Sequence, residues 1–590
     1  MNIIHKIIIP ALALAVMSCT TDWMQESEHP MPEGTGAVPV FTFEGEKSLS
    51  VSKLGGDYEA TVTSNLPWLA ESQSSWILLT SPSRNPGGSA PEKVTFTVTK
   101  NASLEPRSGR IRLWVTNESE EYIDITQEAM TMEDLGGNWH VKPGGTSDGS
   151  SWEKACSLTK ALEEALDADK ILLAAGTYYP ETVLPGGSED ADKTFYVQTN
   201  VKIFGGYPEN PKDGDVADPK KYKSILSGGG TCYHVLVIGA PKSSYFKVEI
   251  DGVTIKDGST AATGTGNVKV NGATCYRFYG GGVVNANSTA ALSGCTISDN
   301  KSVSYCAGIY NADGGDLSLI GCEISRNTGG NGTTIFNSAS ILRMDGCTLS
   351  DNSCTGVGCG VYNFDASGSK RTSVAYIANS FFSNNATDAS AASRRGGGYY
   401  GREGSEGVII NSTFERNVGG NGGGIAVYGT TAYPAKLTVV SCTITGNEAK
   451  NNAGGLEYTF GQATVNVYNS IISGNKAVKD AQDLAGTVSY NTSTVAASAM
   501  KCNIIGDSLY PATEPEAGKT FNPGTMFGEL NGGVFPLAGT GNPALTDGMT
   551  AGELKALTTN ISVDFNAEDL VRDQKGNPRT GRIAGAYVGN

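Results

Sequence analysis

The chain has 590 residues, of which 76 are glycine and 18% are charged, and its formal net charge at pH 7 is −16. Globular proteins average about 7% glycine and about 25% charged residues, so this composition favours short strands and turns over a helix bundle or a coiled coil. The length predicts more than one domain, the 39% of apolar residues excludes a wholly disordered chain, and an acidic balance without basic runs argues against nucleic acid as a partner.

The N-terminus has the pattern of an export signal. Lys6 precedes a short apolar run at residues 7–17, which is too short to span a bilayer comfortably and fits a signal peptide. The letters VMSC at residues 16–19 resemble a bacterial lipobox, and this resemblance implies cleavage before Cys19 and acylation of that cysteine. The alternative is an ordinary secretory signal with a chance cysteine. We expect residues 1–19 to act as a lipoprotein signal, residues 20–37 to form a tether, and the lipid to hold the protein at the bacterial outer membrane, on the cell surface.

Residues 38–130 predict a small β-sandwich. The runs VTFTV (94–98) and IRLWV (111–115) alternate apolar and polar residues as half-buried strands do, and glycine-rich turns separate such runs. About 90 residues with this spacing favour an immunoglobulin-like sandwich.

The same segment resembles the BACON domain of Bacteroidetes surface proteins. The matching features are GGD at residues 55–57, Trp68, Trp76, and the closing IDITQ at residues 123–127. The resemblance implies either a domain that binds carbohydrate or mucin, or a spacer. We expect both tryptophans to lie in the core and not to form a sugar platform.

An internal repeat dominates residues 280–475 and predicts the fold of most of the chain. One half of the repeat recurs at intervals of 25 to 33 residues, in the copies GCTISDN (294–300), GCEISRN (321–327), GCTLSDN (346–352), NSFFSNN (379–385), NSTFERN (411–417), SCTITGN (441–447) and NSIISGN (469–475). The half that precedes each copy reads GGGVVN (280–285), AGIYN (307–311), TTIFN (333–337), GCGVYN (358–363), GGGYYG (396–401), GGGIAV (422–427) and AGGLEY (453–458). A unit of this length with short strands fits one rung of a right-handed parallel β-helix, in which rungs stack to bury their inner faces.

Several motifs of this region resemble those of known β-helix proteins. LTKALEEAL (158–166) has helical spacing and precedes a strand that ends in AAGTY (174–178), an order that resembles the N-terminal cap of pectate-lyase-like proteins. The repeats also resemble polymorphic outer-membrane repeats, and the tail at residues 573–587 resembles the end of surface β-helix proteins grouped by their sorting anchors. The resemblance implies an all-β fold with a short capping helix, with the β-helix at residues 131–505 and C-terminal rungs and a cap at residues 506–590.

Stacking of the rungs predicts two interior columns. If Cys19 is lipidated, 11 of the 12 cysteines remain, so they cannot all pair within one chain. The first column consists of Cys295, Cys322, Cys347 and Cys442, with Ser380, Ser412 and Ser470 at the equivalent positions of the other rungs. The second consists of Asn300, Asn327, Asn352, Asn385, Asn417, Asn447 and Asn475. We expect the thiols to be buried and free, as small hydrophobic side chains, with disulfides between rungs as the alternative. Stacked asparagine amides can bond to one another.

The sequence assigns no catalytic residue. Only His140 and His234 lie in the predicted folded regions, which gives little support to a Ser-His-Asp or Cys-His centre. No metal or other cofactor is indicated, although structural calcium stays open. The excursion at residues 386–406 places Arg394, Arg395 and Arg402 near Tyr399 and Tyr400. A lyase needs a cation and a base, which arginine and tyrosine could supply, whereas a solvated loop is the alternative.

A third column predicts the ligand site. In the GGG[IV]xN half, the residue before the asparagine position should point outward, which selects Val284, Tyr310, Phe336, Tyr362, Tyr400, Ala426 and Glu457. We predict that Tyr310, Phe336, Tyr362 and Tyr400 form an exposed glycan platform along the axis, with Arg394, Arg395 and Arg402 favouring an acidic or sulfated ligand. The alternative is that the rings stack for stability or lie beneath a loop.

Together these patterns predict a non-catalytic, monomeric cell-surface lipoprotein that binds carbohydrate or mediates adhesion and touches the membrane only through its lipid anchor. A polysaccharide lyase or glycoside hydrolase that acts on an acidic glycan in the β-helix groove is the alternative. A purely structural surface protein is a third hypothesis, because fold alone does not settle function.

Overall fold

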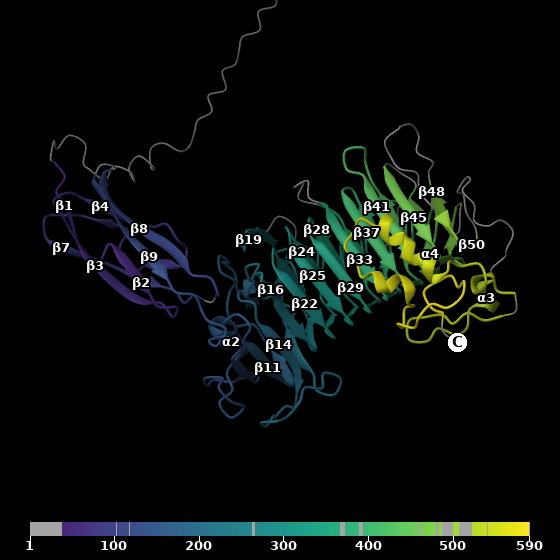
Figure 1. The fold of residues 1–590 in the computed structure, drawn as a ribbon, viewed down its shortest axis with the longest axis horizontal. Coiled ribbons are helices and arrows are strands. Elements are labelled where there is room, and N and C mark those ends of the chain that lie inside the picture. The colour runs from purple at the N-terminus through teal and green to yellow at the C-terminus, as the bar shows by residue number, and fades with distance from the viewer. Residues whose placement is uncertain are drawn as a thin grey trace, which may run out of the picture. The chain divides into compact units, whose positions relative to one another are not determined.

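A computed structural model describes residues 38–101, 103–116, 119–261, 266–365, 372–388, 393–458, 462–479, 483–486, 500–506, 522–539 and 541–588. The predicted signal and tether, including Cys19, lie outside these residues. The chain divides into two compact units, Met1–Leu135 and Gly136–Asn590 (Figure 1). Within the described residues, no helix combines the length and the apolar character that a membrane span requires.

The first unit is the predicted β-sandwich. One antiparallel sheet has the order β1 (Phe41–Glu44), β3 (Gly56–Ser64), β7 (Pro91–Val98), β5 (Ile77–Leu79). The other has the order β2 (Ser48–Val51), β9 (Ser119–Gln127), β8 (Arg107–Thr116), β4 (Trp68–Ser72), β6 (Arg84–Asn85). Trp68 is fully buried and its indole N–H donates to Glu92 at 2.6 Å, while the Arg107 guanidinium covers the half-buried Trp76 ring at 4.4 Å. Both tryptophans therefore belong to the packing of the sandwich, as expected.

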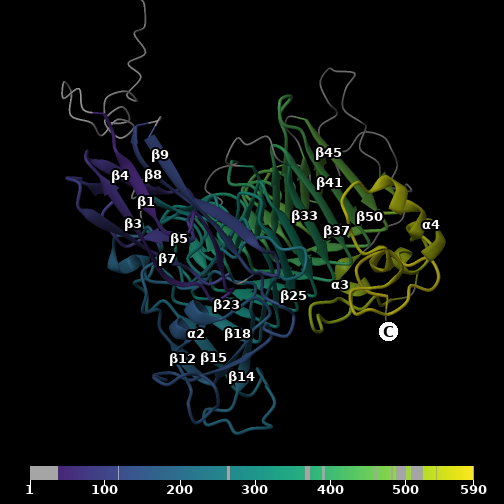
Figure 2. The same cartoon turned by 60° about the vertical axis from the view of Figure 1, so that its left-hand side comes forward.

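The second unit is a parallel β-helix built from three long sheets and one short sheet (Figures 1 and 2). The 12-stranded sheet has the order β10 (Asn138–Val141), β11 (Lys170–Ala174), β14 (Lys202–Tyr207), β17 (Val248–Asp251), β22 (Thr289–Ser293), β25 (Asp316–Ile320), β29 (Ile341–Asp345), β33 (Ser373–Ala378), β37 (Ser405–Ile410), β41 (Ala435–Val440), β45 (Ala463–Tyr468), β49 (Met500–Lys501). The 11-stranded sheet has the order β12 (Gly176–Tyr178), β15 (Ser224–Ser227), β18 (Val253–Lys256), β23 (Thr296–Ser298), β26 (Glu323–Ser325), β30 (Thr348–Ser350), β34 (Phe381–Ser383), β38 (Thr413–Glu415), β42 (Thr443–Thr445), β46 (Ile471–Ile472), β50 (Ile504–Ile505).

The third long sheet carries the candidate site. It has 10 strands, in the order β13 (Phe195–Val197), β16 (Leu236–Ile238), β21 (Val283–Ala286), β24 (Ile309–Ala312), β28 (Ile335–Ser338), β32 (Val361–Asn363), β36 (Tyr399–Arg402), β40 (Ile425–Tyr428), β44 (Leu456–Tyr458), β48 (Leu484–Gly486). The short sheet has the order β27 (Thr328–Gly329), β31 (Ser353–Cys354), β35 (Ala386–Thr387), β39 (Val418–Gly419), β43 (Glu448–Ala449), β47 (Lys476–Ala477). An antiparallel hairpin, β19 (Asn267–Val270) and β20 (Ala273–Tyr276), interrupts the repeat between β18 and β21.

The interior columns follow the predicted register. Cys295, Cys322, Cys347 and Cys442 are buried, and none of the 11 described cysteines forms a disulfide. Each asparagine side chain of the second column donates to the next one at 2.8–3.0 Å, from Asn300 through Asn475, and Asn475 donates to Asp483 at 2.8 Å. The ladder therefore satisfies buried polar groups that the turns between rungs would otherwise leave unpaired.

The first rung is covered as predicted. Helix α2 (Leu158–Glu164) begins at Ser157, whose hydroxyl accepts from the backbone N–H of Lys160 at 3.2 Å. Its buried residues Leu158, Ala161 and Leu162 join the inner core of the β-helix, so the helix covers the open end of the hydrophobic interior.

The C-terminal segment departs from the prediction of further rungs. The last described rung ends at β50 (Ile504–Ile505). The described residues 522–539 and 541–588 form turns and short helices and add no strand to the β-helix. The helices are α3 (Pro523–Met526), η2 (Pro543–Leu545), α4 (Ala551–Ala556), η3 (Leu557–Asn560) and η4 (Ala567–Val571). This segment folds back beside β33, β37 and β41 (Figure 2). The Tyr376 hydroxyl donates to Asp569, and the buried Arg579 donates to Asn411 at 2.9 Å. Apolar residues on the outside of the 12-stranded sheet are thereby covered by the chain's own end.

Candidate functional site

The outward column has the predicted register. Tyr310 pairs with Phe336, Phe336 with Tyr362, and Tyr362 with Tyr400, in successive strands of the 10-stranded sheet. Val284 precedes them, and Ala426 and Glu457 follow. The four rings belong to a hydrophobic cluster that is separate from the inner core, because the alternating partners Ile309, Ile335, Val361 and Tyr399 point inward.

The exposure of the platform is a wrong prediction. Tyr310, Phe336, Tyr362 and Tyr400 have only 2%, 0%, 2% and 3% of their surface exposed. The rings of Phe336 and Tyr362 stack at 5.1 Å, and those of Tyr362 and Tyr400 stack at 5.4 Å with an interplanar angle of 8°. The rung spacing brings equivalent rings face to face, so most of their faces contact one another and are not free for a row of sugars.

An insertion covers one end of this stack. Tyr279 follows the β19–β20 hairpin and packs against Tyr310 at 4.9 Å and against Phe336 at 5.7 Å between ring centroids. Arg277 fixes the insertion, because its guanidinium donates to Asp192 and to Glu189, each at 2.5 Å. The repeat pattern contains no trace of this insertion, so the burial could not be inferred from it.

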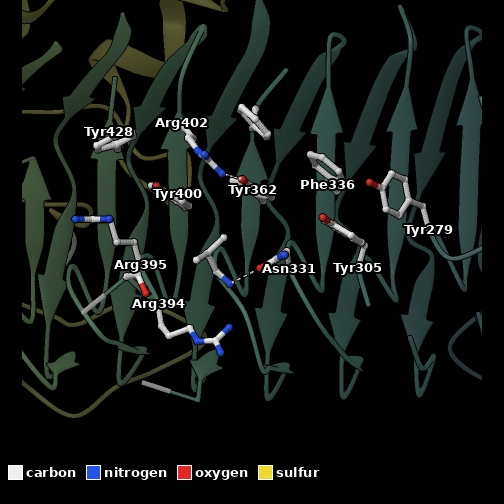
Figure 3. A pocket seen from close by; sticks show the side chains of 13 residues that line it. Tyr279, Tyr305, Asn331, Phe336, Tyr362, Arg394, Arg395, Tyr400, Arg402 and Tyr428 are labelled. Carbon is white, nitrogen blue, oxygen red and sulfur yellow. Dashed lines mark hydrogen bonds between the residues drawn. The ribbon is translucent and has the colours of Figure 1, made fainter. Parts of the chain in front are cut away.

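The rest of the stack borders a pocket of about 680 Å³, here called the aromatic–arginine pocket (Figure 3). It is lined by Tyr279, Tyr305, Asn331, Phe336, Val357, Tyr362, Phe364, Ser393, Arg394, Arg395, Tyr400, Arg402 and Tyr428. Six of the seven predicted ligand residues lie in this lining, and only Tyr310 does not. The volume falls in the range of about 300–1,000 Å³ that is typical of small-molecule sites.

Two arginines are held in place on either side of Tyr400 (Figure 3). Arg402, the last residue of β36, lies over the Phe364 ring at 4.6 Å and donates from Nη1 to the Tyr362 hydroxyl at 3.0 Å. Arg395 lies 5.4 Å from the Tyr428 ring, and its Nε is 3.4 Å from the carboxylate of the fully buried Glu457. The buried acid of the outward column therefore has a positively charged partner, as a buried carboxylate requires.

Arg394 is the third arginine of the pocket and is held less tightly. Its guanidinium lies 4.0 Å from Asp388, and both side chains are about one-third exposed, at 36% and 35%. The backbone carbonyl of Arg394 accepts from Gly420 at 2.6 Å, which fixes the start of the turn that leads into β36. Arg394 and Arg395 thus reach the pocket from the segment before β36, and Arg402 reaches it from the end of β36.

Burial keeps the pocket phenols protonated. Loss of hydration raises the pKa of Tyr362 to about 12, although Arg402 acts in the opposite direction, and it raises the pKa of Tyr400 well above its usual range. At neutral pH both hydroxyls can therefore donate hydrogen bonds.

Other side chains of the pocket were missed by the sequence argument. Tyr428 ends β40 and Phe364 directly follows β32, each two residues after an outward residue of the column, so continued strand alternation places them on the same outer face and could have identified them. Tyr305 and Asn331 come from turns between sheets and Tyr279 from the insertion, and no repeat pattern identifies them.

The remaining candidates lie elsewhere. His234 is buried, its Nδ1 is 3.0 Å from the carbonyl of Gly280, and burial lowers its pKa to about 4. His140 packs against Trp152 with 4.8 Å between ring centroids. Across the described ranges, no group of three or more histidine, cysteine or acidic side chains is arranged to hold a metal ion.

Comparison with known families assigns both units. Residues 66–128 match the BACON family, described as "Putative binding domain, N-terminal", and residues 233–374 match the family described as "Right handed beta helix region". The chain thus has a BACON domain followed by a right-handed parallel β-helix, as predicted. No curated protein sequence matches the chain.

Solved structures give weaker likenesses. A crystal structure of pectate lyase Pel9A is 16% identical with a TM-score of 0.40, covering 77% of this chain and 97% of its own. A Yersinia enterocolitica family 28 exopolygalacturonase is 10% identical with a TM-score of 0.15, covering 76% and 96%. A Bacteroides ovatus GH5 xyloglucanase in complex with a XXXG heptasaccharide is 12% identical with a TM-score of 0.14, covering 29% and 46%. These scores are too low to carry a functional conclusion.

Proposed function

We propose that the chain is a non-catalytic carbohydrate-binding protein whose ligand enters the aromatic–arginine pocket. The observation that carries this proposal is the pocket itself, where half-buried aromatic side chains stand beside preorganised hydrogen-bond donors. Aromatic rings suit the apolar C–H faces of sugars, and the donors suit their oxygens. The half-buried rings of Tyr305, Phe364 and Tyr428 can contact a sugar, which the fully buried rings of the outward column cannot do.

The protonation of the pocket supports binding over catalysis. A lyase needs a base that is deprotonated at the working pH, because it removes the proton next to the uronate carboxyl group. The raised pKa values of Tyr362 and Tyr400 make these phenols donors and poor bases. The tyrosines that the sequence offered for a lyase are Tyr399 and Tyr400. Tyr399 points into the inner core and Tyr400 is a poor base, so we favour binding over a polysaccharide lyase or glycoside hydrolase.

A screen of the full-length chain in mild detergent on a glycan array tests the proposal. We expect binding that Tyr305→Ala weakens, because this half-buried ring lines the pocket, and that the matched control Tyr179→Ala leaves unchanged, because Tyr179 lies outside the pocket and is 60% exposed. Tyr310 and Tyr362 are unsuitable for this test, since truncating buried aromatic rings costs about 3–5 kcal/mol of stability. Absence of binding to every glycan, or release of reducing ends or unsaturated products from them, would contradict the proposal.

We propose further that the protein is a monomeric lipoprotein of the bacterial cell surface, anchored through Cys19, with the BACON domain as a spacer. The buried Trp68 and the arginine-covered Trp76 support the spacer role. The several acyl chains of a bacterial lipoprotein hold it stably, whereas one chain anchors only marginally. Cys19→Ala should therefore move the protein out of the membrane fraction, and a variant that fractionates like the parent would refute the anchor.

A further inference from the structure

The charge of the aromatic–arginine pocket is opposite to that of the chain. The chain has a net charge of −16, yet the side chains that line the pocket include three arginines and no acidic residue among those the structure describes. Nearby acids partly balance them, since Glu457 lies beside Arg395 and Glu403 lies 3.0 Å from Arg402. The arginines face the cavity and the acids stand outside its lining, so the surface that a ligand would meet is positive.

Two of the arginines keep donors for a ligand. A guanidinium has five N–H donors, and Arg402 donates from Nη1 to the Tyr362 hydroxyl while its Nε lies 3.0 Å from the Glu403 carboxylate, which leaves its Nη2 group. Among the described residues, the Arg394 guanidinium has one ion pair, with Asp388 at 4.0 Å, and the side chain is 36% exposed. Arg402 is also held against Phe364 before any ligand arrives, which lowers the entropy cost of binding.

The neighbouring polar groups add further donors. The Tyr362 oxygen accepts from Arg402, so its own O–H is free to donate, and burial keeps that proton in place at neutral pH. The carbonyl of the Asn331 side chain accepts from the backbone N–H of Val357 at 3.0 Å, which orients the amide NH₂ away from that contact. A site made of guanidinium, phenol and amide donors is complementary to a group that only accepts hydrogen bonds.

The ring stack decides how a ligand can lie. Phe336, Tyr362 and Tyr400 present edges and hydroxyl groups because their faces pack on one another. Tyr310 is outside the lining, so the pocket does not extend along the whole column. This geometry fits one end group inserted into the cavity better than a chain laid along the axis.

We infer that the pocket binds the terminal anionic sugar of a glycan, with the carboxylate or sulfate group at Arg402 and the ring of the sugar against the half-buried aromatic side chains. The inference rests on the proposed carbohydrate binding and specifies the ligand of that site. Charge-assisted bonds from arginine to such oxyanions are about twice as strong as neutral hydrogen bonds, so the charge should dominate selectivity.

Calorimetry on the full-length chain in mild detergent tests this inference. The probes are a trisaccharide with a terminal glucuronic acid and its neutral methyl ester, and a trisaccharide with a terminal 6-sulfated galactose and its desulfated form. We expect at least one anionic probe to bind about tenfold or more tighter than its neutral counterpart, with an advantage that shrinks as salt rises from about 50 mM to about 500 mM. An octasaccharide with the same terminal acid should bind as tightly as the trisaccharide.

Three variants assign the effect to the pocket. Arg402→Gln should reduce the anionic preference to about threefold or less. Arg402→Lys retains a cation at the site and should keep a larger preference than Arg402→Gln, so it keeps the test valid if Arg402→Gln lowers stability. Arg326→Gln is the matched control, because Arg326 pairs with Asp299 next to the 11-stranded sheet and lies outside the pocket. It should leave the preference unchanged.

The outcomes separate this inference from the proposed function. Equal binding of acid and methyl ester, and of sulfated and desulfated probes, would leave carbohydrate binding intact and overturn the anionic ligand. A gain of more than about tenfold from trisaccharide to octasaccharide would overturn the end-on geometry. No binding to these probes or to any glycan of the array would refute both.

Discussion

The asparagine ladder should be a major source of stability, and Asn352 is the place to test it. Its side-chain oxygen accepts from the backbone N–H and the amide of Asn327, both at 3.0 Å, and its amide donates to Asn385 at 2.8 Å. Asn352→Ala would leave at least two buried groups unpaired, the backbone N–H of Asn327 and the side-chain oxygen of Asn385. At about 1–3 kcal/mol each, the free energy of unfolding should fall by about 2–6 kcal/mol.

Urea unfolding followed by circular dichroism measures this loss. The matched control is Ser353→Ala, the next residue along the chain, whose side chain is exposed and should change stability by less than about 0.5 kcal/mol. A loss of less than about 1 kcal/mol for Asn352→Ala would refute the idea that the ladder holds the rungs together.

Asn352→Asp tests whether the ladder needs an amide and not merely a polar side chain. A buried carboxyl group has a folded-state pKa above its unfolded value of about 3.9, so its contribution to stability is greatest below that pH and is lost as pH rises. Relative to the parent, this variant should therefore be least stable near neutral pH. Equal stability of parent and variant at pH values near 7 would contradict the argument.

The remaining predictions concern buried titratable groups. The thiols of Cys295, Cys322, Cys347 and Cys442 should be alkylated only after unfolding, because all four are buried, and mass spectrometry of unreduced protein should find them free. Burial also raises the pKa of Cys442 to about 12. Peptides cross-linked through these residues would refute the free-thiol column. Burial lowers the pKa of His234 from 6.5 to about 4, so the folded protein should lose roughly 3 kcal/mol of stability as pH falls through that window. His234→Gln should remove most of this acid sensitivity, and an unchanged pH dependence would show that another group causes it.

The sequence by itself determined the architecture and the register of the β-helix. The repeated GCTISDN and GGGVVN halves identified rungs, and a rung has only one way to bury its apolar residues, because strand alternation sends each side chain either in or out. The cysteine and asparagine columns and the pairing of Tyr310, Phe336, Tyr362 and Tyr400 followed from this rule and match the structure. The three arginines were also selected from sequence, because residues 386–406 depart from the repeat.

Only the tertiary structure decided what covers each outer face. An outward direction does not mean exposure, and the β19–β20 insertion, fixed by Arg277 and Asp192, closes over one end of the ring stack. In the same way, residues 522–588 fold back over the 12-stranded sheet and add no rungs. Insertions and chain ends lie outside the repeat, so the repeat carries no information about where they pack. Stacking of the rings on one another, with the insertion over one end, turned a predicted open platform into a pocket, because it buried the ring faces and left ring edges, hydroxyl groups and guanidinium groups to line the cavity.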